Sequence, residues 1–163
     1  MAEDATNNGT SSENGAGDQG QQLVIHTQYI KDFSFENPGA PQVLMDNTGQ
    51  PEIEINVNVT ATPLNEERLF EVVLSIRATA TREEQDIFIA ELAYAGIMSV
   101  APSVADNALH PIVMIEGPRM IFPFARAILS ETTQKGGFMP LNIQPIDFIR
   151  VYQQGIQAQQ GNA

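Results

Sequence analysis

The side chains that could do chemistry in this chain are few and widely separated. Its 163 residues include no Cys and two His, and neither His26 nor His110 belongs to an HxxxH or HxH pattern. A thiolate nucleophile and a cysteine zinc site are therefore excluded, and a histidine zinc site would need carboxylates from a distant part of the chain. We expect no metal site and no cofactor.

Hydroxyl and carboxyl groups offer little more to a catalytic mechanism. Ser130 and Thr132 have no adjacent base, and Glu83 and Glu84 lie in a polar segment typical of a solvated turn. The phosphate-binding patterns GxxxxGK[ST] and GxGxxG do not occur, which argues against the use of ATP. We expect a protein that is not an enzyme, while a small carboxylate enzyme or ligand-binding domain stays open as an alternative.

The charge balance restricts the partners of the chain. Its 8 basic and 20 acidic residues give a net charge of −12, so nucleic acid and anionic membranes should be repelled and a basic partner attracted. No run approaches the roughly 18 apolar residues of a membrane span, and the N-terminus lacks the basic start and apolar core of a secretory signal. We predict a cytoplasmic protein that binds no nucleic acid and does not insert into membranes.

The domain organisation follows from the distribution of apolar residues. Residues 1–22 contain almost none, and the Gln-rich end at 158–163 is similar. Neither stretch can bury enough surface to offset the entropy lost on ordering. We therefore predict two disordered ends that flank a single domain over residues 23–157, which is long enough to bury a real core.

Alternation of apolar and polar residues predicts four β-strands. In the first strand, five residues with odd numbers should share one face: Leu23, Ile25, Tyr29, Phe33 and Phe35. The fourth strand is apolar on both faces and should be covered on both. The expected strands are Leu23–Phe35, Glu52–Thr62, Phe70–Ala80 and Asp86–Val100.

A long loop should connect the first two strands. Prolines and glycines break residues 36–51 repeatedly, yet Val43, Leu44 and Met45 form an apolar centre. Loops of this length are uncommon inside compact domains and are often functional. We therefore expect this loop to contribute to a binding site.

Helical spacing appears only after the strands. The longest helix is expected within residues 117–141, from Pro118 at its first position to a left-handed exit at Gly136 and Gly137, with a kink at Pro123. A short helical lead-in at 106–116 and an amphipathic helix at 144–157 should flank it. Strands followed by helices predict an α+β fold: a four-stranded antiparallel meander with long helices packed on one face.

Apolar residues exceed what such a fold can hide. One layer of helices covers one face of the sheet, and this leaves the second face of the fourth strand and the centre of the long loop without cover. Either copies of the chain associate or an extended ligand binds.

Six segments, taken in order, resemble the SecB family of bacterial protein-export chaperones. They are YIKDFSFENP at 29–38, PEIEINVNV at 51–59, EVVL at 71–74, AELAYAGI at 90–97, PRMIFPFAR at 118–126 and GGFMPLNIQPIDF at 136–148. The resemblance implies a cytoplasmic homotetramer, a dimer of dimers, that binds unfolded precursor proteins without ATP. It also implies delivery of those precursors to the SecA ATPase. A SecB-like chaperone of a toxin–antitoxin system is an alternative on the same fold.

A site for unfolded clients should offer adaptable apolar pockets, because the clients share exposed apolar side chains and no sequence. We expect this groove to use the loop and the residues behind it: Phe35, Val43, Leu44, Met45, Met98, Ile121, Phe122 and Phe138.

The resemblance also implies a docking face and an oligomer interface. The acidic face that meets the basic, zinc-bearing tail of SecA maps onto Asp32, Glu36, Ile89 and Glu91. Asp32 and Glu36 have equal parity, as do Ile89 and Glu91, so each pair can point to one sheet face. Residues of opposite parity and the principal helix are the candidates for the oligomer interface: Ala90, Leu92, Tyr94, Phe124 and Ile128.

Overall fold

The computed structural model describes residues 20–46 and 49–161. The predicted disordered end at 1–22 lies outside these residues except for its last three positions. Within the described residues the chain folds into one antiparallel sheet with helices, so the α+β class predicted from the sequence is confirmed.

The sheet contains four strands in the order β1-β4-β3-β2. Their bounds agree with the predicted ones to within two residues at each end: β1 Leu23–Glu36, β2 Glu52–Pro63, β3 Leu69–Arg82 and β4 Gln85–Val100. The meander covers β2 to β4, whereas β1 pairs with β4 at the opposite edge from β2. Alternation identifies a strand but not its neighbour, because the pairing of β1 with β4 joins residues far apart in the sequence.

Two irregularities in β1 change the face to which its side chains point. The register against β4 shifts between Ile25 and Thr27 and again between Ile30 and Asp32. Each shift adds one residue and reverses the alternation. Leu23 and Phe35 therefore face the helices as predicted, but Tyr29, which was expected beside them, points to the opposite face.

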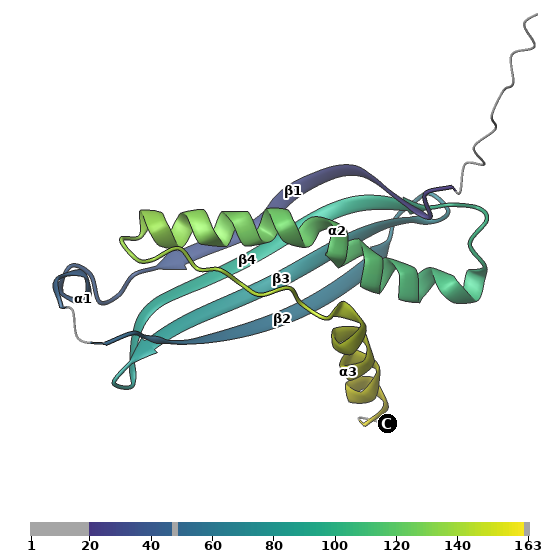
Figure 1. Cartoon of the computed structure of the whole chain (residues 1–163). Coiled ribbons are helices and arrows are strands. Elements are labelled where there is room, and N and C mark those ends of the chain that lie inside the picture. Colours follow the sequence, from purple (N-terminus) through teal and green to yellow (C-terminus); the bar gives the residue numbers. More distant parts are fainter. Residues whose placement is uncertain (1–19, 47–48, 162–163) are drawn as a thin grey trace, which may run out of the picture.

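Helix α2 (Asp106–Lys135) is one continuous helix of 30 residues, not a lead-in followed by a principal helix. It passes through Pro111, Pro118 and Pro123, and Figure 1 shows that it is bent near its middle. Each proline removes one backbone hydrogen bond and bends a helix. Packing against the sheet on both sides of Pro118 keeps the helix continuous. It ends where predicted, but only one of the two glycines is left-handed: Gly137 has φ 92°, whereas Gly136 keeps a right-handed φ of −74°.

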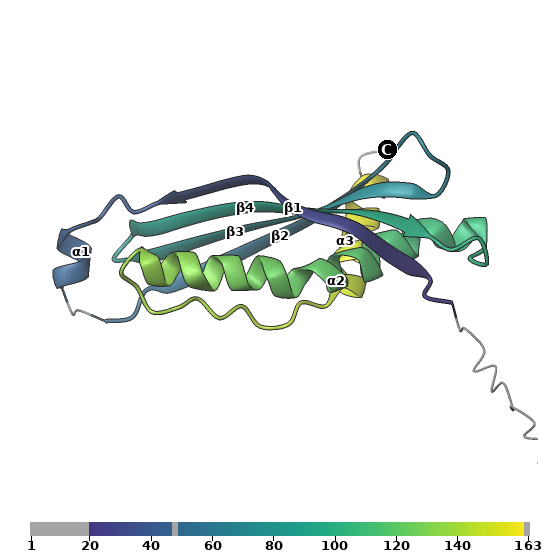
Figure 2. The same cartoon turned by 90° about the horizontal axis from the view of Figure 1, so that it is seen from above.

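The core lies between α2 and the inner face of the sheet, which we define as the face that α2 covers. Every third or fourth residue of α2 is buried, among them Val113, Ile121 and Leu129. They pack on inner-face residues such as Leu74 and Ile76. Figure 2 shows α2 on this side of the sheet, with residues 136–147 running back beside it to helix α3 (Phe148–Gln160).

Helix α3 begins where Asp147 accepts a hydrogen bond from the backbone N–H of Arg150 at 3.1 Å. It extends to Gln160, so residues 158–160 are helical rather than part of the predicted disordered end. Residues 162–163 lie outside the described part of the chain. Among the described residues, none of the helices is both long and apolar enough to cross a membrane.

Candidate functional site

One end of the molecule carries an apolar cavity, at the place where the predicted long loop meets the end of α2. The loop follows β1 and contains a one-turn helix, α1 (Gln42–Met45). The connection from β1 to β2 must cross the width of the sheet, because these strands lie at opposite edges. This crossing places α1 beside residues 137–142, which follow α2.

Three aromatic rings form a row beside the cavity. The ring centroids of Phe35 and Phe88 lie 5.9 Å apart, and those of Phe88 and Phe138 lie 5.0 Å apart. Gly136 makes this row possible, since a Cβ at that position would lie 2.6 Å from Cζ of Phe35. Gly137 allows a similar approach, because a Cβ there would lie 3.0 Å from Cδ2 of Leu44.

Polar contacts fix the segments around the cavity. The side-chain amide of Asn37 donates to the backbone carbonyl of Gly136 at 2.9 Å, which ties the end of β1 to the end of α2. The buried Thr133 hydroxyl accepts from the N–H of Leu141 at 2.9 Å and so holds the segment after α2 in place. Both contacts join segments that share no backbone hydrogen bonds of the sheet or of a helix.

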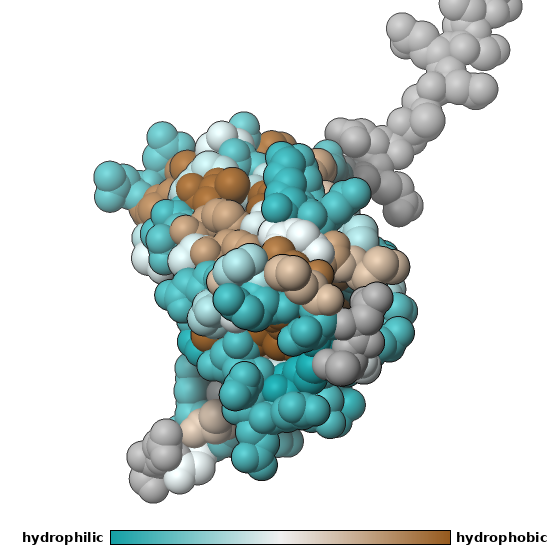
Figure 3. All heavy atoms as spheres, turned by 90° about the vertical axis from the view of Figure 1, so that its left-hand side faces the viewer, coloured by the Kyte–Doolittle hydropathy of each residue, from teal (hydrophilic) through white to brown (hydrophobic). Residues whose placement is uncertain are grey.

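The cavity has a volume of about 510 Å³ and opens to the surface. Apolar side chains make up most of its lining, and Figure 3, which looks at this end of the molecule, shows apolar residues gathered among polar ones. Arg82 and Asp46 also line it, and Arg82 reaches the carbonyl of Asp46 at 3.5 Å. The larger apolar residues of the lining are Val43, Leu44, Ile53, Phe88, Phe138, Met139 and Leu141.

The structure brings together five of the eight predicted groove residues. Val43, Leu44 and Phe138 line the cavity, Phe35 lies in the ring row, and Met45 extends from α1 with 81% of its surface exposed. Sequence reasoning missed Ile53, Phe88, Met139 and Leu141. Phe88 was assigned to a strand face but not to the groove, because nothing in the sequence shows that β4 begins beneath the loop.

The other three predicted groove residues do not reach this cavity. Met98 and Ile121 are fully buried between the sheet and the middle of α2. Phe122 packs edge-on against Phe148 of α3, with ring centroids 6.0 Å apart. These residues hold α2 and α3 in place, because the helical spacing directs them to the core rather than toward α1.

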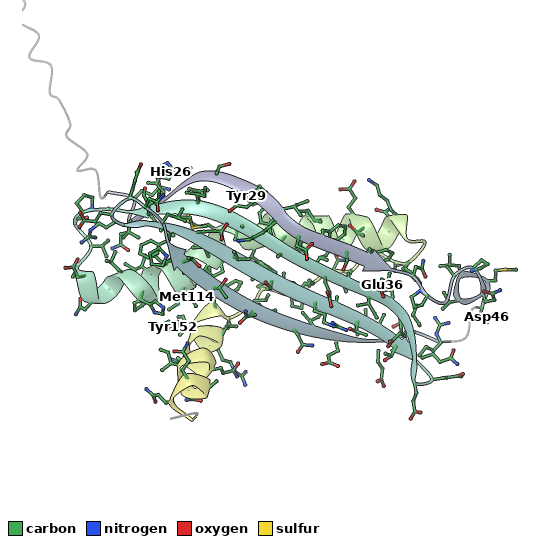
Figure 4. All side chains as sticks on the ribbon, turned by 180° about the vertical axis from the view of Figure 1, so that it is seen from behind. His26, Tyr29, Glu36, Asp46, Met114 and Tyr152 are labelled. Atoms are coloured by element: carbon green, nitrogen blue, oxygen red, sulfur yellow. The ribbon has the colours of Figure 1, made fainter. Side chains whose placement is uncertain are left out.

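The four predicted docking residues share the outer face of the sheet, opposite α2. Glu36 of β1 pairs with Ile89 of β4, and Asp32 and Glu91 project on the same side. Figure 4 views the sheet from this side, where none of the described helices covers the strands. Asp32, Glu36 and Glu91 are exposed and Ile89 is half-buried, which gives an acidic surface with an apolar centre.

A second polar group on this face joins two strands. The Tyr29 hydroxyl and the Lys31 ammonium both donate to the carboxylate of Glu71, the latter at 2.6 Å. Burial, reinforced by the hydrogen bond to Glu71 and its negative charge, raises the pKa of Tyr29 to about 12. The hydrogen bonds from Lys31 and then Tyr29 lower the pKa of Glu71.

The predicted oligomer residues divide between the core and the surface. Ala90 and Leu92 are buried on the inner face, under α2, so neither side chain is available to a second copy. Phe124 is 50% exposed and stacks on Tyr94, with ring centroids 6.5 Å apart. Ile128 is half-buried on the same helix. Odd or even position along a strand shows which sheet face a residue is on, but not whether a helix covers that face. The sequence could therefore not show that Ala90 and Leu92 are buried.

Within residues 20–46 and 49–161, no group of three His, Asp or Glu side chains is arranged to hold a metal ion. The arrangement that the structure does offer is an apolar cavity open to solvent and, on the outer face, an acidic surface. Such surfaces bind by burial of side chains and by charge, and both suit protein partners.

Comparisons with known proteins agree with this geometry. The family model described as preprotein translocase subunit SecB matches residues 16–159. The chain is 48% identical to the protein-export protein SecB of Rhodospirillum centenum over 160 residues, covering 96% of this chain and 93% of that protein. It is 49% identical to that of Rhodospirillum rubrum over 141 residues, covering 86% of each chain.

A solved structure with low identity shares the fold. The SecB-like chaperone Rv1957 of Mycobacterium tuberculosis, solved with a peptide of the HigA1 antitoxin, aligns with a TM-score of 0.64 at 13% identity. The alignment covers 77% of this chain and 91% of that one. The export relatives favour the export chaperone over both alternatives, the toxin–antitoxin chaperone and the carboxylate enzyme. The chain belongs to the SecB family of protein-export chaperones.

Proposed function

We propose that this chain is an ATP-independent holdase that binds unfolded precursor proteins in its end cavity and delivers them to SecA. The observation that carries this proposal is the open apolar cavity of about 510 Å³, bordered by side chains that the folded chain leaves on its surface. Leu44 and Met45 are 44% and 81% exposed. A protein keeps such side chains exposed at the cost of solubility, which a binding function would offset.

The energetics of the cavity suit weak and adaptable capture. Each apolar client side chain that becomes buried contributes about 1.5–3 kcal/mol, and ordering of the client takes back much of this gain. Firm holding then requires several cavities acting on one chain. Folded proteins escape, because their apolar side chains are already buried.

Several cavities on one particle would follow from a homotetramer, a dimer of dimers, in the cytoplasm. The exposed apolar residues beside α2 support such an assembly. Ile30 and Phe33 of β1 are 49% and 37% exposed on the inner face, and Tyr94, the β4 partner of Ile30, stacks on Phe124. Native mass spectrometry with and without an unfolded precursor tests this part, and a particle that stays monomeric would exclude it.

Client holding can be tested with Leu44→Asp. A charge in the cavity should weaken binding of an unfolded precursor about tenfold, the equivalent of one lost apolar contact of about 1.4 kcal/mol. The readout is the delay in refolding of the precursor at equimolar chaperone. Ile149→Asp is the matched control, because Ile149 is also 44% exposed but lies on α3. Equal holding by wild type and Leu44→Asp would contradict the proposal.

Delivery to SecA should use the outer face, with Asp32, Glu36, Ile89 and Glu91 meeting the basic, zinc-bearing tail. We expect Asp32→Lys combined with Glu91→Lys to abolish the low-salt enhancement of tail binding and to leave client holding nearly unchanged. Glu66→Lys with Glu67→Lys is the control, since it changes the net charge equally in an exposed turn. Parallel loss of both activities would refute two separate surfaces.

A further inference from the structure

The outer face of the sheet contains a hollow of about 290 Å³ in its centre. Its floor is formed by two small residues on adjacent strands, Ser75 of β3 and Ala93 of β4, which lie opposite each other. The same row continues to Asp32 of β1 on one side and to Asn58 of β2 on the other. The hollow therefore has an acidic wall toward β1 and an amide wall toward β2.

One end of the hollow is closed by an ion pair between neighbouring strands. Arg77 of β3 lies directly opposite Glu91 of β4, and its guanidinium donates to the Glu91 carboxylate. Both side chains line the hollow, and they are 53% and 47% exposed. Adjacent rows of a sheet bring Asp32 and Glu91 within about 7–8 Å of each other. One cationic side chain placed in the hollow could thus contact both carboxylates.

Arg77 already supplies a cation to one of these two carboxylates, that of Glu91. Among the ion pairs of the described residues, the other cation on this face is Lys31, and its partner is Glu71 rather than a residue of the hollow. Within the described residues neither Asp32 nor Glu36 has an ion-pair partner. Glu91 is therefore the one acid of the predicted docking set whose charge is neutralised inside the free chain.

We propose that Arg77 is a built-in competitor for the basic partner of the outer face, and that docking requires a lysine or arginine of the partner to displace it from Glu91. This inference rests on the proposed docking function and specifies how that face is regulated. The partner's cation then enters the hollow between Asp32 and Glu91, while the guanidinium of Arg77 turns toward solvent. Arg77 thereby lowers the affinity of the face for a basic partner by the strength of its own pair with Glu91.

The competitor has a cost in affinity that can be measured. An exposed ion pair of this kind is equivalent to roughly a two- to fivefold change in an equilibrium constant. Arg77→Gln should therefore tighten binding of the zinc-loaded SecA tail peptide about two- to fivefold at about 50 mM salt. The gain should largely disappear at about 500 mM salt, where charges on the surface are screened.

The control for net charge is Arg119→Gln. Arg119 also forms an exposed pair, with Glu116 at 2.5 Å, but it lies on α2 on the other side of the sheet. Its loss changes the net charge by the same amount and should leave peptide affinity unchanged. A gain in affinity with Arg119→Gln equal to that with Arg77→Gln would overturn the proposal, because it would reduce the effect to overall charge.

A double-mutant cycle separates competition from simple repulsion. If Arg77 acts by occupying Glu91, the gain from Arg77→Gln should vanish in a Glu91→Gln background. A gain that persists there would overturn the proposal. The docking function fails separately: if Asp32→Lys with Glu36→Lys binds the peptide like wild type, the face itself is wrong. If that variant loses binding and Arg77→Gln shows no gain, only the competitor is refuted.

Discussion

Gly117 allows α2 to approach the sheet closely, and its replacement by alanine tests the packing that positions both candidate sites. A Cβ at this position would lie 3.2 Å from both methyl groups of Val72 and 3.4 Å from Sδ of Met98. Val72 and Met98 are fully buried, so neither can move into solvent. Gly155 of α3 provides the comparison, because nothing lies within 4 Å of a Cβ built there.

The expected magnitudes follow from two opposing terms. Alanine in place of glycine inside a helix stabilises it by about 0.5–1 kcal/mol, and this applies at both positions. At Gly117 the added methyl also overpacks the core, which costs about 1–3 kcal/mol. Gly155→Ala should therefore stabilise the chain, and Gly117→Ala should destabilise it by about 1 kcal/mol. The two variants should differ in Tm by about 4–8 °C.

Thermal unfolding followed by circular dichroism, at one protein concentration, measures both variants. A third variant, Val72→Ala, removes the methyl groups that the new Cβ would meet. The double variant Gly117→Ala with Val72→Ala should be more stable than the sum of the single effects predicts, by about 1 kcal/mol. Additive effects, or equal stabilisation by Gly117→Ala and Gly155→Ala, would refute the close approach of α2 to β3.

Three further predictions concern local contacts. The pKa of Tyr29 is raised to about 12, so its contribution to stability is present below about pH 10 and lost as the pH rises through 12. Ultraviolet titration of Tyr29→Phe should therefore lose an ionisation near pH 12 that wild type shows. The pKa of Glu71 is lowered, so its contribution should be lost in acid, as the pH falls through that lowered value. Asp147→Ala removes the N-cap of α3 and should lower the free energy of opening of its first turn by about 1 kcal/mol, so that the amide hydrogens there exchange about fivefold faster, while Asp147→Asn should not.

The sequence predicted the strands well because their side chains alternate with a period of two, and burial on one face preserves this period. Alternation could not predict the side-chain direction where β1 departs from a period of two residues. The first register shift in β1 turns Tyr29 outward, and the second returns Phe33 and Phe35 to the inner face. Only its partner on β3, Glu71, explains why the outward position of Tyr29 is favourable. Such a partner is a property of strand order, which local patterns do not contain.

Helix α2 shows a second limit of local patterns. Pro118 has the properties of a first helical residue, and this predicted the wrong start. The buried stripe runs through Val113, Gly117 and Ile121. Glycine has no side chain, so Gly117 does not continue the helical spacing of apolar side chains in the sequence. The contact that Gly117 makes with the sheet joins the two predicted helices into one.

The cavity was predicted in part because its loop carries apolar residues among turn residues, a combination that suggests binding. The residues taken from the middle of α2 and β4 were misplaced for a different reason. They are apolar for the sake of the core, and composition cannot distinguish a core side chain from one that lines a groove. Only the crossing of the loop over the end of the sheet shows that Phe88 belongs to the cavity and Met98 does not.

The two candidate sites meet on adjacent residues of β1. Phe35 pairs with Ala90 on the inner face and lies in the ring row, whereas Glu36 pairs with Ile89 on the outer face. Because a strand directs successive side chains to opposite faces, the proposed client cavity and the proposed docking face lie on opposite sides of the sheet. Two strands connect the sites directly: β1, where the contact of Asn37 with Gly136 adds a link to α2, and β4, where Phe88 of the cavity precedes Ile89 of the outer face. If both proposed sites are occupied as proposed, movement of the cavity walls is then the route by which docking on the outer face would release a client, because the Phe35 and Glu36 side chains point away from each other.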